Sequence, residues 1–132
     1  MKQIIITTLF LIIGLAAFSQ KDSVRGKQFH LKGKLTETVQ ITPSCGYIAF
    51  GTVVEFEVKD LLGMRYKNKN IGIIVTCPDM YKEGFFKKGK MYEVSFSDTN
   101  PADFGWTVGN RNLLKKNGLA FDPYVVSLKR IQ

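Results

Sequence analysis

Histidine and tryptophan are almost absent from this 132-residue chain, which contains only His30 and Trp106. A single histidine leaves little basis for a zinc site or for a histidine general base. The two cysteines, Cys45 and Cys77, form no C-x-x-C pair, which excludes the common cysteine-based metal motifs. Consensus motifs of serine hydrolases, zinc proteases, phosphate-binding loops and dinucleotide-binding turns are also missing. We therefore expect no metal and no cofactor, and the sequence assigns no catalytic residue.

Long apolar runs are rare, and the one that is present lies at the start of the chain. Lys2 precedes an apolar run over 4–18, and the small residues of 17–19 come directly before a polar segment. This is the three-part pattern of a secretory signal. The run is shorter than the roughly 20 apolar residues that span a bilayer, so an uncleaved anchor is only the alternative. We predict a signal peptide over 1–19 and one exported domain over 20–132, soluble after cleavage and either periplasmic or secreted.

Acidic residues are outnumbered by basic ones. Without residues 1–19 the chain has 18 basic and 11 acidic residues, a net charge of +7. A basic balance suits anionic partners such as phosphate, lipid head groups, acidic glycans or nucleic acid. The basic residues are spread over several short groups, which is typical of solvated turns and strand faces, and export argues against nucleic acid. We expect an unidentified protein or glycan as partner, and nothing indicates the oligomeric state.

An even number of cysteines in an exported domain favours a disulfide. A bridge between Cys45 and Cys77 would close a loop of about 33 residues and stabilise the fold by roughly 3–4 kcal/mol on the chain-entropy estimate. Two buried free thiols are the alternative.

Apolar and polar residues alternate along much of the chain, which is the pattern of strands that bury one face. The alternation in the first strand is interrupted at Gly33, where we expect a bend or a bulge. A nearly continuous apolar run over 71–77 predicts a strand that is buried on both faces. The predicted strands cover 29–41, 48–58, 71–77, 91–97 and 124–131.

Two segments lack this alternation. Residues 78–86 begin with a proline and with the capping candidate Asp79, which predicts one or two helical turns. Three aromatic residues close to these turns either plug one end of the core or form a ligand platform; they are Tyr81, Phe85 and Phe86. The longest stretch without periodicity is 98–118, where a short helical turn is expected near 112–116, and a loop of this length is often functional.

The order of three strands, a short helix and two strands resembles the OB-fold, a five-stranded Greek-key barrel. The resemblance covers roughly residues 29–131 and is carried by the arrangement of the elements. It predicts a mainly β protein, a five-stranded OB-fold-like Greek-key barrel with one short helix between strands three and four. A small lipocalin-like barrel or a β-sandwich is the alternative. The resemblance also implies ligand contacts across strands two and three and in the loops over 42–46 and 98–118.

Four residues in or beside these loops are candidate ligand contacts, namely Phe104, Trp106, Arg111 and Tyr47. Flat aromatic faces suit sugar rings, bases or the side chains of a partner, although Phe104 and Trp106 could equally fold back onto the core. These residues favour an exported, non-enzymatic binding module for an envelope protein, a glycan or another extracytoplasmic ligand.

Two other function classes stay open. Basic residues interleaved with aromatic ones suit a polyanion or a single-stranded nucleic acid. A small hydrolase-type enzyme without a recognisable motif would have to use a few scattered side chains, which are His30, Asp98, Asp103 and Asp122.

Overall fold

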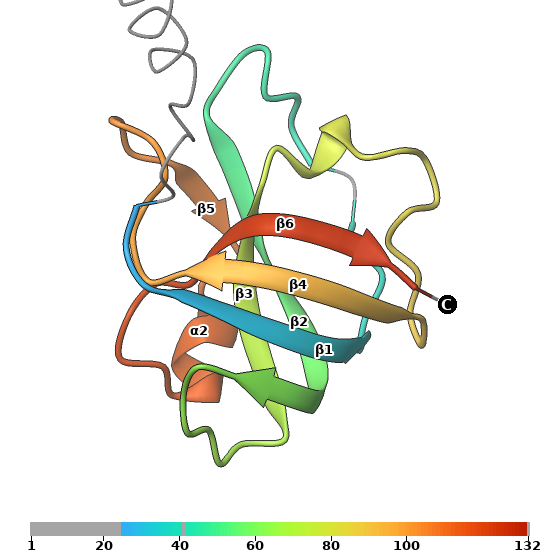
Figure 1. The fold of residues 1–132 in the computed structure, drawn as a ribbon. Coiled ribbons are helices and arrows are strands. Elements are labelled where there is room, and N and C mark those ends of the chain that lie inside the picture. Colours follow the sequence, from blue (N-terminus) through green and yellow to red (C-terminus); the bar gives the residue numbers. More distant parts are fainter. Residues whose placement is uncertain (1–24, 41, 132) are drawn as a thin grey trace, which may run out of the picture.

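The computed structural model describes residues 25–40 and 42–131. The predicted signal peptide over 1–19, its cleavage point and Ile41 lie outside these residues. Within them, no helix is long and apolar enough to cross a membrane. The elements, drawn in Figure 1, are β1 (Gln28–Leu35), β2 (Phe50–Leu62), β3 (Asn70–Thr76), the 3-10 turn η2 (Pro78–Met80), β4 (Met91–Ser97), β5 (Thr107–Gly109), α2 (Asn112–Asn117) and β6 (Tyr124–Arg130).

Five strands close into a barrel. Their order is β1-β4-β6-β3-β2, and the pairing of β2 with β1 completes the ring (Figure 1). The neighbours are antiparallel except β3 and β6, which pair in parallel. The structure is therefore a mainly β, closed five-stranded barrel, as predicted, and it is compatible with an OB-fold-like barrel. The short strand β5 lies outside the ring and pairs in parallel with the beginning of β2.

Side chains of alternating residues fill the interior of the barrel. Phe29, Leu31 and Leu35 are buried along β1, and the residues between them are exposed. Gly33 occupies the remaining inward position, where an added Cβ would lie only 2.9 Å from the Cβ of Phe56. The register of β1 with β2 shifts at this point, which confirms the predicted irregularity near Gly33.

The first strand is shorter than its alternation predicts. It ends at Leu35, whereas the pattern indicated a strand over 29–41. β4 begins only at Met91, so β1 has no partner on that side beyond its end. The chain bends at Thr36, whose backbone N–H and hydroxyl both donate to the carbonyl oxygen of Glu55 at 3.1 Å. The prediction was wrong here because alternation reports which face is buried and not where a neighbouring strand begins.

The connection between β3 and β4 closes one end of the barrel. η2 is a single turn, in agreement with the one or two helical turns predicted here, but Asp79 lies inside the turn and no side chain caps it. Phe86 is buried, and Tyr81 and Phe85 pack against the main core. The hydroxyl of Tyr92 donates a 2.5 Å hydrogen bond to the carbonyl of Phe85 and accepts one of 2.9 Å from the N–H of Lys87. These contacts are those of a core plug, the first of the two roles considered for these aromatic residues.

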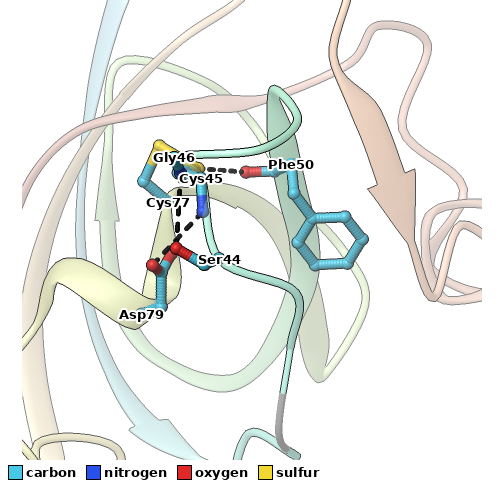
Figure 2. The surroundings of a disulfide bond; sticks show 6 residues. All are labelled: Ser44, Cys45, Gly46, Phe50, Cys77 and Asp79. Carbon is cyan, nitrogen blue, oxygen red and sulfur yellow. Dashed lines mark hydrogen bonds between the residues drawn. A yellow bond between two sulfur atoms is a disulfide. The ribbon is translucent and has the colours of Figure 1, made fainter.

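A disulfide joins Cys45 to Cys77, which confirms the predicted bridge (Figure 2). Its Cα atoms are 5.4 Å apart, and it connects the loop before β2 with the end of β3. The backbone N–H of Cys45 donates to Asp79 Oδ2 at 3.3 Å, and the N–H of Cys77 donates to the carbonyl of Phe50 at 2.9 Å. The loop before β2 is thus fastened to the rest of the fold by one covalent bond and by the hydrogen bond from Cys45 to Asp79.

Candidate functional site

The outer face of β2 and β3 is covered by the chain itself. α2 packs on this face and forms a second apolar cluster with residues from the strands and from β5; its members are Val53, Ile74, Leu114 and Tyr124, with Trp106, Val108 and Leu113 packed against them. Gly72 leaves room for the side chain of Val53 under α2, because an added Cβ would lie 2.8 Å from Cγ1 of Val53 and 3.5 Å from the carbonyl oxygen of Leu113. α2 therefore covers part of the ligand surface that the OB-fold resemblance implies across strands two and three, and exposed surface remains beside the helix and in the neighbouring loops.

Phe104 and Trp106 lie together in the loop between β4 and β5. Their ring centroids are 5.0 Å apart, with a tilt of 51°. Asn100 holds both residues, because its Oδ1 accepts a 3.0 Å hydrogen bond from Nε1 of Trp106 and its Nδ2 donates one of 2.8 Å to the carbonyl of Phe104. Trp106 packs against the second cluster, whereas Phe104 is 55% exposed. The pair thus combines the two roles considered for it: Trp106 folds back onto the core, and Phe104 faces solvent.

Tyr47 lies in the loop before β2. The N–H of Thr107 donates to the carbonyl of Ala49 at 2.8 Å, so this loop and the loop before β5 lead into adjoining strands at the same end of the pair. Tyr47 is 92% exposed and Ile48 is 44% exposed. We use the name aromatic rim for the exposed apolar residues of the two loops together with the tryptophan below them, which are Tyr47, Ile48, Phe104 and Trp106.

Arg111 stands apart from the aromatic rim. It follows the opposite end of β5, and its Nη1 lies 3.2 Å from Oδ2 of Asp122. It lines a cavity of about 210 Å³ together with Leu114, Leu119 and Phe121. Because β5 separates it from the two aromatic residues, the structure does not bring this fourth sequence candidate together with the others.

The residues considered for catalysis are not assembled either. Nδ1 of His30 lies 2.9 Å from Oγ of Ser95 on the exposed face of β1 and β4. Asp98 accepts a backbone N–H, and Asp103 and Asp122 each form an ion pair with an arginine. In the part of the chain that the structure describes, no group of three or more His, Cys, Asp or Glu side chains could hold a metal ion.

A polar cluster around Glu55 was not expected. Alternation placed this residue on the solvent face of strand two, yet its side chain is only 9% exposed. Oε1 accepts hydrogen bonds from the hydroxyl of Thr36 at 3.1 Å and from Nδ2 of Asn70 at 3.2 Å. Oε2 accepts from Nδ2 of Asn117 at 3.0 Å and from Nζ of Lys116 at 3.3 Å. The donors come from elements far apart in sequence, so no local pattern indicates the cluster.

These hydrogen bonds determine the charge of Glu55. Burial by itself would raise the pKa of this carboxyl, but hydrogen bonds from Asn117, Lys116 and Thr36 outweigh it and hold the pKa below the ordinary value of 4.5. The group is therefore a carboxylate at neutral pH. A cavity of about 310 Å³ opens beside it, bordered also by Thr52. Because all four hydrogen bonds of Glu55 are internal, we assign it to the scaffold.

Two surfaces thus differ in what they can do. The aromatic rim exposes the rings of Tyr47 and Phe104 to solvent, and these rings can contact a flat or apolar ligand. The Glu55 cluster is saturated with internal hydrogen bonds and holds α2 against the barrel. Comparisons of the chain with protein-family models, with curated proteins and with solved structures find no match.

Proposed function

We propose that this protein is an exported, non-enzymatic binding module that contacts an envelope protein, a glycan or another extracytoplasmic ligand through the aromatic rim. The observation that carries the proposal is the aromatic pair held by Asn100, in which Phe104 is 55% exposed and rests 5.0 Å from Trp106. A ring that is already held in place loses little conformational freedom on contact, which makes it an effective anchor.

Export is supported by the disulfide. Disulfides form and persist in oxidising compartments such as the periplasm and the extracellular space, and they are rare in the cytosol. The bridge between Cys45 and Cys77 fastens the loop that carries Tyr47, so the same bond that indicates the compartment also limits the motion of the proposed contact surface.

The variant Phe104→Ala tests the contact surface. The ring of Phe104 is exposed and takes no part in the hydrogen bond between Trp106 and Asn100, so removing the ring leaves that bond in place. We expect binding to glycan arrays and to immobilised envelope proteins to weaken about ten-fold or more, as for an aromatic anchor, with an unchanged thermal midpoint. Intrinsic fluorescence of Trp106 reports the binding directly.

The control is Leu62→Ala, which removes another large apolar side chain, 59% exposed, at the far end of β2. We expect it to leave binding unchanged. If Phe104→Ala and Tyr47→Ala both bind every ligand of the parent with the parent's affinity, the aromatic rim is not the contact surface.

A further inference from the structure

Basic side chains gather at one end of the barrel. β1 ends there, β4 begins there, and the C-terminal end of β6 lies on the same side, next to the turn over 82–90 (Figure 1). This end exposes seven basic residues, which are Lys34, Lys82, Lys87, Lys88, Lys90, Lys129 and Arg130. The exposed acidic residues beside them are Glu37, Glu83 and Glu93, so the formal net charge of this basic end is +4.

Backbone contacts hold these segments together. The N–H of Gly89 donates to the carbonyl of Leu35 at 2.8 Å, and the N–H of Leu35 donates to the carbonyl of Lys90 at 2.9 Å. Nη1 of Arg130 donates to the carbonyl of Gly84 at 2.9 Å. The turn is thereby fixed against the ends of β1 and β6, and the basic residues of three segments share one surface.

Most of these charges are not neutralised by a neighbour. Among the described residues, one cation of the basic end has a carboxylate partner, Lys88, whose Nζ lies 3.1 Å from Oε1 of Glu37. Arg130 contacts neutral carbonyl groups instead. Elsewhere on the molecule cations are paired more often, as Lys116 is with Glu55 and Arg111 with Asp122. Among the described residues, six of the seven cations of the basic end thus lack a carboxylate partner, whereas four of the ten basic residues elsewhere have one.

The composition of the basic end favours a broad anionic surface as its partner. Six of its seven cations are lysines, which are flexible point charges, whereas recognition of one fixed phosphate or carboxylate favours the planar fork of arginine. The strongly exposed aromatic rings that a single-stranded nucleic acid would stack on, Tyr47 and Phe104, are not part of this end. Ile131, 37% exposed, adds an apolar side chain next to the cations.

We propose that the basic end docks the protein onto a membrane surface that contains anionic lipid head groups. The attraction is between the exposed lysines and the negative surface potential of the bilayer, and each basic residue close to such a surface strengthens binding about five-fold at physiological salt. The docking residues are separate from the aromatic rim, so this inference does not depend on the proposed function.

Sedimentation with vesicles tests the docking. The parent is expected to bind phosphatidylcholine vesicles that contain phosphatidylglycerol more tightly than pure phosphatidylcholine vesicles, and added salt weakens this binding because it screens the charges. The combined substitutions Lys34→Gln, Lys82→Gln, Lys87→Gln and Lys90→Gln are expected to weaken binding about a hundred-fold or more. These lysines are exposed, and none forms an ion pair within the described residues, although Lys34 lies opposite Glu57 in the pairing of β1 with β2. Circular dichroism is therefore expected to stay unchanged.

A matched control removes the same charge from other parts of the surface by Arg65→Gln, Lys67→Gln, Lys69→Gln and Lys115→Gln, all at exposed positions. We expect it to bind within a few-fold of the parent. Residues 1–19 are identical in every variant and cannot produce a difference between them. Equal losses in both variants, or equal binding of the parent to both kinds of vesicle, overturn the proposal. Binding to an acidic polysaccharide through the same lysines, without binding to vesicles, overturns the assignment to lipid.

Discussion

Glu55 is the residue that connects the segment after β1, strand β3 and helix α2. Its carboxylate accepts hydrogen bonds from the segment after β1, from the start of β3 and from the last turn of α2. A carboxylate that is nearly buried is costly unless its oxygen lone pairs are occupied, and four donors occupy them here. The charge is tolerated because it is fully partnered, and it joins three elements that make few other polar contacts with one another.

Replacing Glu55 by glutamine is expected to lower the free energy of unfolding at neutral pH by about 1–3 kcal/mol, the cost of a buried donor left without a partner. The amide keeps one acceptor oxygen, so one pair of donors, either Lys116 and Asn117 or Thr36 and Asn70, faces an NH2 group. Denaturant unfolding measures the loss. Glu57→Gln is the control, because Glu57 pairs only with the exposed Lys59, and its effect is expected to be much smaller. An equal loss in both variants would contradict the role of Glu55.

The same pair of proteins gives a pH test. The pKa of Glu55 is lower in the folded chain than the ordinary value of 4.5, so its contribution is fully present above pH 4.5 and is lost as the pH falls through the folded pKa. The difference in unfolding free energy between the parent and Glu55→Gln is therefore expected to shrink on acidification below pH 4.5. A difference that stays constant in a series of unfolding curves would show that the charge of Glu55 does not stabilise the fold.

Among the elements, α2 depends most on its surroundings. It has six residues, too few for an isolated helix to form in water. Gly118 ends it in the left-handed region, with φ of 66°, and donates its N–H to the carbonyls of Leu114 and Lys115. Packing of Leu114 on Val53 and Ile74 stabilises it, as do the hydrogen bonds from Lys116 and Asn117 to Glu55. The helix exists because the barrel offers it an apolar face.

Gly72→Ala tests this packing. A Cβ at Gly72 would lie 2.8 Å from Cγ1 of Val53, so Val53, which packs against α2, must shift, whereas the carbonyl oxygen of Leu113 at 3.5 Å is in ordinary contact. We expect the free energy of unfolding to fall by about 1–3 kcal/mol, as for other overpacked sites, measured by thermal or denaturant unfolding. Gly105→Ala is the matched control, because no heavy atom lies within 4 Å of its added Cβ. Comparable losses in the two variants would mean that the space between Gly72 and Val53 is not tightly packed.

The disulfide acts on the loop before β2. The double variant Cys45→Ser with Cys77→Ser is expected to unfold with a free energy about 3–4 kcal/mol lower than that of the parent, since the unfolded chain regains the freedom of the open loop. Denaturant unfolding measures the change. A reducing agent is expected to destabilise the parent by a similar amount and to leave the double variant unaffected. A parent that is insensitive to reduction would contradict this account.

At the scale of the whole molecule, the described residues form two apolar clusters that share the same two strands. Val53 and Ile74 belong to the outer cluster, whereas their neighbours Val54 and Ile73 belong to the core of the barrel. Successive side chains of a strand point to opposite faces, so β2 and β3 cannot lose one cluster without exposing residues of the other. The barrel and its cover are thus coupled through shared backbone.

We therefore expect the protein to unfold in a single cooperative transition. Fluorescence of Trp106 reports the outer cluster, and far-ultraviolet circular dichroism reports the barrel, so the two midpoints are expected to coincide. An earlier transition in fluorescence alone would show that α2 and β5 detach while the barrel stays folded.

Much of the barrel could be predicted from local pattern. Alternation and one nearly continuous apolar run identified the five barrel strands, Gly33 marked the irregularity in the first of them, and the even cysteine count indicated the bridge. The end of β1 and the burial of Glu55 could not be predicted, because both depend on residues that are distant in sequence. The same reason explains why Phe104, Trp106 and Arg111, close in sequence, are divided between two sites by β5.

The amino-acid sequence by itself determined which residues enter the core, because burial of an alternating apolar face needs no information beyond the period of the strand. Tertiary structure alone decided that α2 covers β2 and β3, that Trp106 packs while Phe104 stays exposed, and that unpaired lysines collect at one end. These features arise when segments far apart along the chain are brought side by side, and their energies depend on distances that no local pattern contains.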